Sequence, residues 1–212
     1  MQIIKLKPLS VCDTNSYIVS SDESNTALID APDNPDYILS EIEKNNLNLK
    51  MILLTHGHFD HVGAVAKLAE KTGCDVYIHE ADFPKLLDVD KSLVTYFGLN
   101  EFSPYKQAKH FKDGDTISLD ELTFKIIHTP GHTSGSVCIT IDDVMFSGDT
   151  LFAGSIGRTD LPDGNSLTMI SSLKKLAGID KNYIVYPGHM SQTTLDDEKT
   201  FNPYMTGLIK EN

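Results

Sequence analysis

The sequence contains no long hydrophobic run and no recognisable leader segment. No stretch approaches the roughly 18 apolar residues that a membrane-spanning helix needs. The N-terminus, MQIIKLKPLS, has neither an extended hydrophobic stretch nor a small-residue cleavage site. We therefore expect a soluble, cytoplasmic protein without a membrane partner.

Cysteine is also scarce. Cys12, Cys74 and Cys138 are odd in number, widely spaced and outside any C-x-x-C arrangement. This pattern argues against a disulfide framework and against a zinc site made of thiolates. We expect all three cysteines to be buried free thiols.

Basic residues are fewer than acidic ones. The chain has 18 lysines and arginines against 30 aspartates and glutamates, which gives a formal net charge of -12 and a pI near 4.9. Such a surface repels phosphodiester backbones and anionic membranes, so we expect no nucleic-acid partner. The 212 residues and the 40% hydrophobic composition suffice for a substantial core, and we expect a single domain over residues 1–212.

Short apolar runs bounded by turn residues recur along the chain and predict β-strands. The predicted strands are residues 3–6, 15–20, 26–30, 50–55, 75–79, 116–119, 122–129, 136–141, 143–149 and 182–189. Because these runs occur in both halves of the chain, we expect more than one sheet.

Apolar residues at helical spacing predict helices between these strands. The predicted helices cover residues 33–46, 64–73 and 166–178, and the mixed stretch 80–100 is expected to be a helical excursion. The helix at 166–178 is expected to bury one face made of Leu167, Ile170, Leu173 and Leu176. The combination predicts an α/β fold, a four-layer αββα sandwich with two mixed sheets face to face and helices outside.

Residues 53–61, LLTHGHFDH, contain three of the chain's eight histidines and one aspartate directly after an apolar run. Other histidines and aspartates also follow predicted strands. Side chains at strand ends stand at the rim of a rigid sheet, where several can converge on one point. The candidate metal ligands chosen on this basis are His56, His58, Asp60, His61, His132, Asp149 and His189.

The chemistry of these side chains indicates two metal ions. Imidazole and carboxylate groups are good ligands for zinc, iron or manganese, and one carboxylate can bridge two cations. Seven such side chains exceed the needs of one tetrahedral ion and match two. We expect two divalent ions, with zinc preferred and iron or manganese as alternatives.

Four motifs resemble those of the metallo-β-lactamase-fold hydrolases: T-H-G-H-F-D-H-V-G at 55–63, P-G-H-T at 130–133, S-G-D-T at 147–150 and Y-P-G-H at 186–189. All ligand positions of that family are present and in order. The segment LFAGSIGRTDLPDGNS at 151–166 and the ending PGHMSQTTLDDEKTFNPY are similar to the short, single-domain glyoxalase II-like branch, also called hydroxyacylglutathione hydrolase-like. The resemblance thus covers nearly the whole chain.

The resemblance also implies a role for each ligand. It assigns one ion to His56, His58 and His132, and the other ion to Asp60, His61 and His189, with Asp149 as the bridge. It implies catalytic roles for Asp60 and Asp149 and hydrolysis of a small 2-hydroxyacyl thioester by a metal-bridging hydroxide. The departing thiolate needs no protein acid.

Two features leave the substrate open. Only 23 residues follow His189, whereas two-domain glyoxalase II enzymes carry a C-terminal helical domain that supplies much of the glutathione site, so the use of glutathione is not implied. Arg158 is a candidate substrate-binding residue, because an arginine on this loop can engage a carboxylate or an oxyanion. The alternative is that Arg158 pairs with Asp160 and braces the loop.

Other functions are compatible with the same motifs, because a fold does not fix a function. A persulfide dioxygenase is similar in the GRTD loop and would use a single iron held by His56, His132 and Asp149. A lactonase, another ester hydrolase or a phosphodiesterase would keep two ions. A secreted β-lactamase is disfavoured by the lack of a signal peptide and by Asp149, where one lactamase subclass has cysteine. A non-enzymatic metal-binding role is a last alternative.

Overall fold

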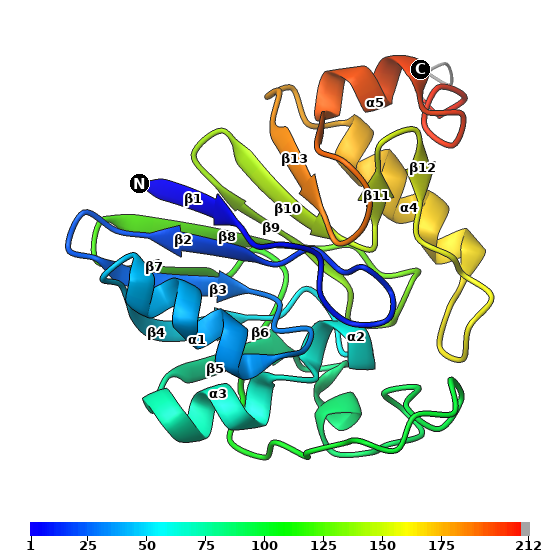
Figure 1. Cartoon of the computed structure of the whole chain (residues 1–212). Coiled ribbons are helices and arrows are strands. Elements are labelled where there is room, and N and C mark those ends of the chain that lie inside the picture. Colours follow the sequence, from blue (N-terminus) through cyan, green and yellow to red (C-terminus); the bar gives the residue numbers. More distant parts are fainter. Residues whose placement is uncertain (209–212) are drawn as a thin grey trace.

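The computed structural model describes residues 1–208, and within them the strands form two large mixed sheets and one small hairpin (Figure 1). The first sheet has the order β1 (Gln2–Lys5), β2 (Tyr17–Ser20), β3 (Asn25–Ile29), β4 (Asn48–Leu53), β5 (Asp75–His79), β6 (Lys109–Phe111). The second has the order β14 (Thr193–Thr194), β13 (Ile184–Pro187), β10 (Val144–Gly148), β9 (Val137–Ile141), β8 (Leu122–His128), β7 (Thr116–Leu119). The hairpin pairs β11 (Leu151–Phe152) with β12 (Ser155–Ile156).

Both sheets mix strand directions. Strands β3 to β6 are parallel, and β1 to β3 are antiparallel. In the second sheet β10 and β13 are parallel, whereas β7 to β10 are antiparallel. Parallel neighbours point their C-terminal ends to the same edge of a sheet, so loops that follow them emerge together.

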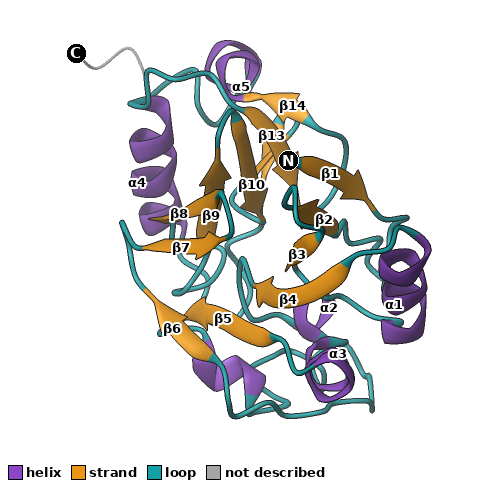
Figure 2. Ribbon diagram, turned by 90° about the vertical axis from the view of Figure 1, so that its left-hand side faces the viewer, coloured by secondary structure: helices purple, strands orange, loops and turns teal. Residues whose placement is uncertain are grey.

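Helices cover the outer faces of the two sheets. Figure 2 shows two layers of strands between α4 (Ser166–Ala177) on one side and α1 (Pro35–Lys44) and α3 (Val65–Thr72) on the other. Helix α5 (Leu195–Phe201) lies near α4 (Figure 1), and the short α2 (Phe59–Val62) follows β4. The fold is therefore α/β with two mixed sheets and external helices, as the sequence predicted.

Alternation along the strands explains why three apolar layers form. In β2, Ile18 faces the helices, while its neighbours Tyr17 and Val19 face the second sheet. There they pack with Phe124 and Phe146, both fully buried. Successive strand side chains point to opposite faces, so each strand supplies residues to two layers. A third apolar layer joins the second sheet to α4 and α5.

The buried face of α4 differs from the predicted one. Met169, Leu173 and Leu176 are buried, whereas Leu167 is 75% and Ile170 41% exposed. At 100° per residue, Met169, Leu173 and Leu176 fall within a narrow arc, and Leu167 lies almost opposite. The prediction was wrong at Leu167 and Ile170 because it counted apolar residues without including Met169.

Several short elements were not predicted. They include α2 inside the histidine cluster, β6, the β11–β12 hairpin, β14 and α5. Between residues 80 and 100, the structure has one 3-10 turn, Phe83–Leu86, and irregular turns elsewhere. All three cysteines are free thiols; Cys74 and Cys138 are buried as expected, but Cys12 is only half-buried.

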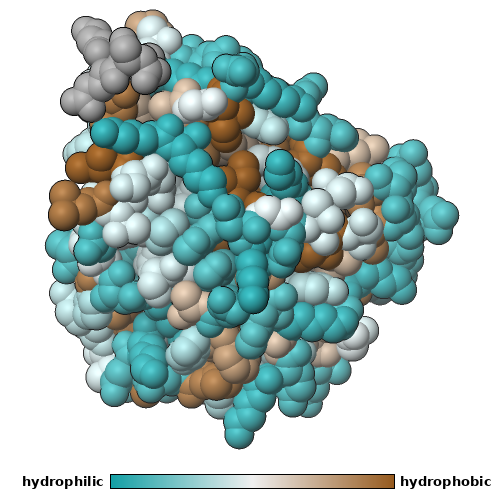
Figure 3. Space-filling view, turned by 180° about the vertical axis from the view of Figure 1, so that it is seen from behind, coloured by the Kyte–Doolittle hydropathy of each residue, from teal (hydrophilic) through white to brown (hydrophobic). Residues whose placement is uncertain are grey.

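The face opposite the view of Figure 1 is mainly polar. Figure 3 shows hydrophilic residues over most of the face seen from behind, with apolar ones in separate patches. Among the described residues, no helix combines the length and hydropathy that crossing a membrane would require.

Candidate metal centre

The seven predicted ligands lie where strand ends of both sheets meet. His56 and His58 follow β4 of the first sheet, and the short α2 directly after them carries Asp60 and His61. The second sheet supplies the other three, each just after a strand or between two strands: His132, Asp149 and His189. The structure thus brings together all seven side chains that the sequence singled out.

Three histidines form what we call the first group: His56, His58 and His132. Their ring nitrogens lie within 4.8 Å of one another, and His58 Nδ1 is 2.9 Å from His132 Nε2. All three side chains are buried. Three imidazoles around one point form the ligand set of many catalytic zinc sites.

An aspartate and two histidines form the second group: Asp60, His61 and His189. Asp60 Oδ2 is 3.7 Å from His61 Nε2 and 3.4 Å from His189 Nε2. These separations are longer than hydrogen bonds and leave room for an ion between the three atoms.

Asp149 stands between the two groups. One carboxylate oxygen, Oδ2, is 3.5 Å from His132 Nε2 and 3.3 Å from His189 Nε2, and Oδ1 is 3.4 Å from His61 Nε2. The same carboxylate therefore faces both groups. This is the geometry of a bridging ligand.

Buried atoms without hydrogen-bond partners show that the residues fit metal ions. Among the described residues, five side-chain nitrogen or oxygen atoms are fully buried and unpaired, and four of them are in the cluster: His56 Nε2, His58 Nε2, His61 Nε2 and Asp149 Oδ1. Buried polar atoms are normally paired, because an unpaired one costs about 1–3 kcal/mol. A cation is the partner that such acceptors lack.

Hydrogen bonds on the far side of the rings fix which nitrogen faces inward. His132 Nδ1 donates to the Arg158 carbonyl at 2.8 Å, and His189 Nδ1 donates to the Cys12 carbonyl at 3.1 Å. A carbonyl can only accept, so each Nδ1 carries a hydrogen and each Nε2 is the nitrogen that faces the centre. Such outer partners are typical of histidine ligands.

Asp30 plays the same part for His61. The fully buried His61 places Nδ1 2.8 Å from Asp30 Oδ2, and the Asp30 carboxylate also accepts from the backbone N and the hydroxyl of Thr55, both at 2.8 Å. In a similar way, the Thr14 hydroxyl donates to Asp60 Oδ2 at 3.0 Å. Asp30 and Thr14 were not among the residues predicted from the sequence. Asp30 could have been found, because it also follows an apolar strand, whereas nothing in the sequence marks Thr14.

Burial keeps two histidines of the first group neutral. It lowers the pKa of His56 well below the usual range, and burial together with the neighbouring His132 lowers the pKa of His58 to about 3. Neutral imidazole is the form that binds metal, so these histidines need not lose a proton at neutral pH.

Carboxylates charge the second group. Burial alone would lower the pKa of His61, but Asp30, Asp60 and Asp149 raise it well above the usual range. Burial would also lower the pKa of His189, but the nearby carboxylates of Asp149 and Asp60 raise it to about 9. Conversely, burial would raise the pKa of Asp60, but the positive charges at His61 and His189 lower it to about 2. Without metal, this group therefore pairs imidazolium with carboxylate.

A cavity of about 430 Å³ opens onto the cluster. Beyond the ligands, its walls are mainly apolar and include Leu93, Phe97 and Phe152. Arg158 also lines it, but its guanidinium makes two hydrogen bonds of 2.7 Å to the Asp160 carboxylate and is 52% exposed. The ion pair that the sequence left open is present, and the same guanidinium borders the cavity.

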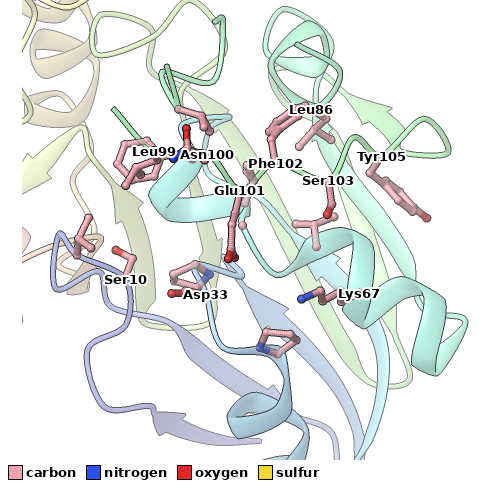
Figure 4. Close-up of a pocket in the computed structure, with 18 of the residues that line it drawn as sticks. Ser10, Asp33, Lys67, Leu86, Leu99, Asn100, Glu101, Phe102, Ser103 and Tyr105 are labelled. Atoms are coloured by element: carbon pink, nitrogen blue, oxygen red, sulfur yellow. The ribbon is translucent and has the colours of Figure 1, made fainter. Parts of the chain in front are cut away.

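A second cavity of about 430 Å³ lies on the other side of Phe59, which borders both spaces. Figure 4 shows its charged rim, where the side chains of Asp33, Lys67 and Glu101 surround the opening. None of the seven candidate ligands borders this second cavity. The chemistry of the cluster therefore belongs to the first cavity.

Comparisons with known proteins agree with this architecture. The sequence profile of the Metallo-beta-lactamase superfamily matches residues 9–189. The chain is 36% identical over 206 residues to the hydroxyacylglutathione hydrolase GloC of Haemophilus influenzae, a match that covers 95% of this chain and 97% of that protein.

Solved structures share the fold over nearly the whole chain. The BLEG-1 B3 metallo-beta-lactamase superposes with a TM-score of 0.90 at 32% identity, covering 97% of this chain and 100% of that one. TTHA1623 in a di-iron-bound form gives 0.85 at 36% identity, covering 95% and 99%. ETHE1 from Myxococcus xanthus gives 0.78 at 25% identity, covering 100% and 92%.

Proposed function

Because the chain belongs to the metallo-beta-lactamase superfamily, we propose that it is a two-metal hydrolase that cleaves a small thioester of a 2-hydroxy acid. The observation that carries the proposal is the pair of ligand groups joined by Asp149, with buried, unpaired acceptor atoms. The first group would hold one ion, the second group the other, and Asp149 would bridge them. Zinc is the proposed metal, and the di-iron form of TTHA1623 supports iron as the alternative.

The reaction divides between the ions and the residues around them. Two divalent ions, if held by these residues, would supply a hydroxide at neutral pH and positive charge beside the substrate carbonyl. Asp60, with its pKa lowered to about 2 and its Oδ2 held by Thr14, is a fixed acceptor that can orient the attacking water. Asp149 holds the two groups at a fixed separation. The thiolate leaves unprotonated, so no side chain is needed as an acid.

The walls of the first cavity determine which chemical groups of a substrate can bind beside the cluster. Leu93, Phe97 and Phe152 give it apolar walls that exclude bulk water from the reacting carbonyl. Arg158 at the same cavity is proposed to bind a carboxylate or oxyanion of the substrate, in competition with Asp160. The name of the Haemophilus influenzae relative supports a hydroxyacyl thioester of glutathione as the first compound to test.

The proposed partner is thus a small molecule, and the proposed location is the cytoplasm. The net charge of -12 supports the absence of a nucleic-acid or membrane partner, because the surface would repel both.

A second candidate is a persulfide dioxygenase with one iron held by His56, His132 and Asp149. The similarity to ETHE1 leaves this alternative open. The unpaired Nε2 of His61 argues for the two-metal site, because a single iron on those three ligands would leave it without a partner.

Metal content and turnover test the proposal together. We would measure zinc, iron and manganese per chain in protein purified without added metal, then assay S-lactoylglutathione, a simple acyl thioester, a lactone, a chromogenic β-lactam and glutathione persulfide. The expected result is about two equivalents of metal and hydrolysis of the hydroxyacyl thioester. The β-lactam belongs in the panel because of the similarity to BLEG-1.

Two variants make the assay specific. Asp149→Asn should lower thioester turnover by about a hundredfold or more, because it weakens both ion sites. Lys109→Met, which removes an exposed ion pair with Asp75, should leave thioester turnover unchanged. If the protein contains one equivalent of iron and consumes persulfide in an oxygen-dependent reaction, it is a dioxygenase and the hydrolase proposal is wrong. A metal-replete protein that hydrolyses none of the thioesters would refute it.

A further inference from the structure

A buried aspartate lies beside the loops of the first group, and within the described residues its carboxylate has no hydrogen bond to a side chain of the seven ligands. Asp82 is 0% exposed and accepts four hydrogen bonds. Oδ2 accepts from Gly57 N and Thr133 Oγ1, both at 2.8 Å, and Oδ1 accepts from Gly135 N at 2.9 Å and Lys85 Nζ at 2.7 Å. A carboxylate with four donors in fixed directions holds the chain segments that supply them.

Two of those segments carry the first group. Gly57 is the residue between His56 and His58, and Thr133 directly follows His132. The first segment follows β4 of the first sheet, and the second joins β8 to β9 of the second sheet. Asp82 therefore ties together, through hydrogen bonds, the two loops that must meet for three imidazoles to surround one ion.

Lys85 extends the connection to a third loop. Its ammonium, 6% exposed, also lies 2.6 Å from Asp163 Oδ2, which accepts from the backbone N and the hydroxyl of Ser134 at 3.0 and 2.9 Å. Asp163 belongs to the loop whose Arg158 carbonyl accepts from His132 Nδ1. The network thus also fixes the loop that orients the His132 ring.

Packing leaves these loops no freedom around Asp82. A Cβ atom built on Gly57 would lie 2.6 Å from Lys85 Cβ, and one built on Gly135 would lie 2.6 Å from Asp82 Cγ. Real Cβ atoms do not approach that closely, so the backbone is seated directly against the two side chains. Glycine is required at both positions for this approach.

The second group is held by other residues. Its outer partners are Asp30 for His61, Thr14 for Asp60 and the Cys12 carbonyl for His189. None of the hydrogen bonds to Asp82 or Lys85 comes from these residues. Loss of the network should therefore affect the two ion sites unequally.

We propose that Asp82, held in place by Lys85, is a positioning residue for the first metal ion, fixing the loops of His56, His58 and His132 against each other. The inference rests on the proposed two-metal site. It predicts a selective change: the affinity of the first group for metal falls when the network is broken, while that of the second group does not.

The test measures zinc binding to each group alone. In a His189→Ala background the first group remains complete, and in a His58→Ala background the second group does. Asp82→Asn is introduced into both, and Zn²⁺ is titrated into metal-free protein in competition with a chromophoric chelator. We expect about 10–100-fold weaker binding in the His189→Ala background, the usual effect of removing an outer-shell partner, and less than a threefold change in the His58→Ala background.

Thr133→Val provides a milder second variant, because it removes one hydrogen bond to Asp82 and no charge. It should weaken the first group in the same direction if Asp82→Asn does not fold. Lys109→Met, which breaks an exposed ion pair of 2.7 Å, is the control and should change neither affinity. Equal weakening in both backgrounds, or in neither, would overturn the proposal. If unsubstituted protein binds fewer than two zinc ions, the proposed function fails, but the His189→Ala comparison still decides the role of Asp82.

Discussion

Replacing Asp30 with asparagine should weaken the second metal group by changing which nitrogen of His61 carries the hydrogen. In the structure, His61 Nδ1 donates to Asp30 Oδ2, so Nε2 is the nitrogen that faces the centre and binds metal after it has released its proton. An asparagine whose oxygen still accepts from Thr55 N must present its NH₂ group to His61. His61 then accepts at Nδ1, and its hydrogen moves to Nε2.

The magnitude follows from the contacts that survive. In metal-free Asp30→Asn protein, the hydrogen on His61 Nε2 faces Asp149 Oδ1, 3.4 Å away, and the Thr55 hydroxyl can turn to accept. Stability should therefore change by no more than about 1 kcal/mol, the net value of one hydrogen bond. When metal binds Nε2, the hydrogen returns to Nδ1 and faces the NH₂ group of the asparagine, so zinc binding to the second group should weaken about 10–100-fold, or about 1.4–2.7 kcal/mol.

Asp30→Ala is the informative contrast. It leaves Thr55 N and His61 Nδ1 without an acceptor, at about 1–3 kcal/mol each. Asp30 also has φ +58°, where alanine costs about 1–2 kcal/mol more and asparagine is tolerated. The assay combines thermal unfolding of metal-free protein with zinc titration against a chelator. The reasoning is refuted if Asp30→Asn binds zinc as the unsubstituted protein does, or if it unfolds as readily as Asp30→Ala.

Three further predictions follow from pKa shifts, burial and exposure. Metal uptake by the second group should strengthen as pH rises to about 9, because His61 and His189 have raised pKa values and must release protons to bind metal at lower pH. The measurement is the number of protons released when zinc is added to the metal-free protein in weakly buffered solution. Leu173→Ala should destabilise by about 2–5 kcal/mol and Leu167→Ala by less than about 0.5 kcal/mol in urea unfolding, because the first is buried and the second 75% exposed; equal values would contradict the helix orientation. Arg158→Met should raise the thioester KM with little change in Tm, because the ion pair is exposed; an unchanged KM would leave Arg158 with a bracing role only.

The ligand cluster was predictable from the sequence because its signal is local and chemically narrow. Histidines and aspartates placed directly after apolar strands stand out from the surrounding pattern, and parallel strand ends bring them to one edge. The strands were predictable for a similar reason, since alternation along β7 or continuous burial in β10 is recorded in consecutive residues.

The supporting residues were not predictable in the same way. Asp82 and Asp163 lie in irregular segments and Lys85 lies in the 3-10 turn Phe83–Leu86, and their role depends on which distant loops pack against them. Long-range hydrogen bonds such as Asp82 to Thr133, 51 residues apart, have no periodic signature. The prediction of which face of α4 is buried failed for a related reason, because the sheet beneath the helix decides which of several apolar stripes is buried.

The contrast in charge between the two groups explains how the fold can bury this site before any metal is bound. In the second group, Asp60 and Asp149 have lowered pKa values while His61 and His189 have raised ones, so two carboxylates meet two imidazoliums. Each buried carboxylate then has an imidazolium partner, and a lone buried carboxylate, which would be costly, is avoided. In the first group, burial lowers the pKa values of His56 and His58, and neutral rings need no counter-charge. Metal binding to the second group therefore releases protons, whereas metal binding to the first group uses imidazoles that are already neutral. In both groups the outer hydrogen-bond partners must hold each imidazole in the same orientation with and without metal.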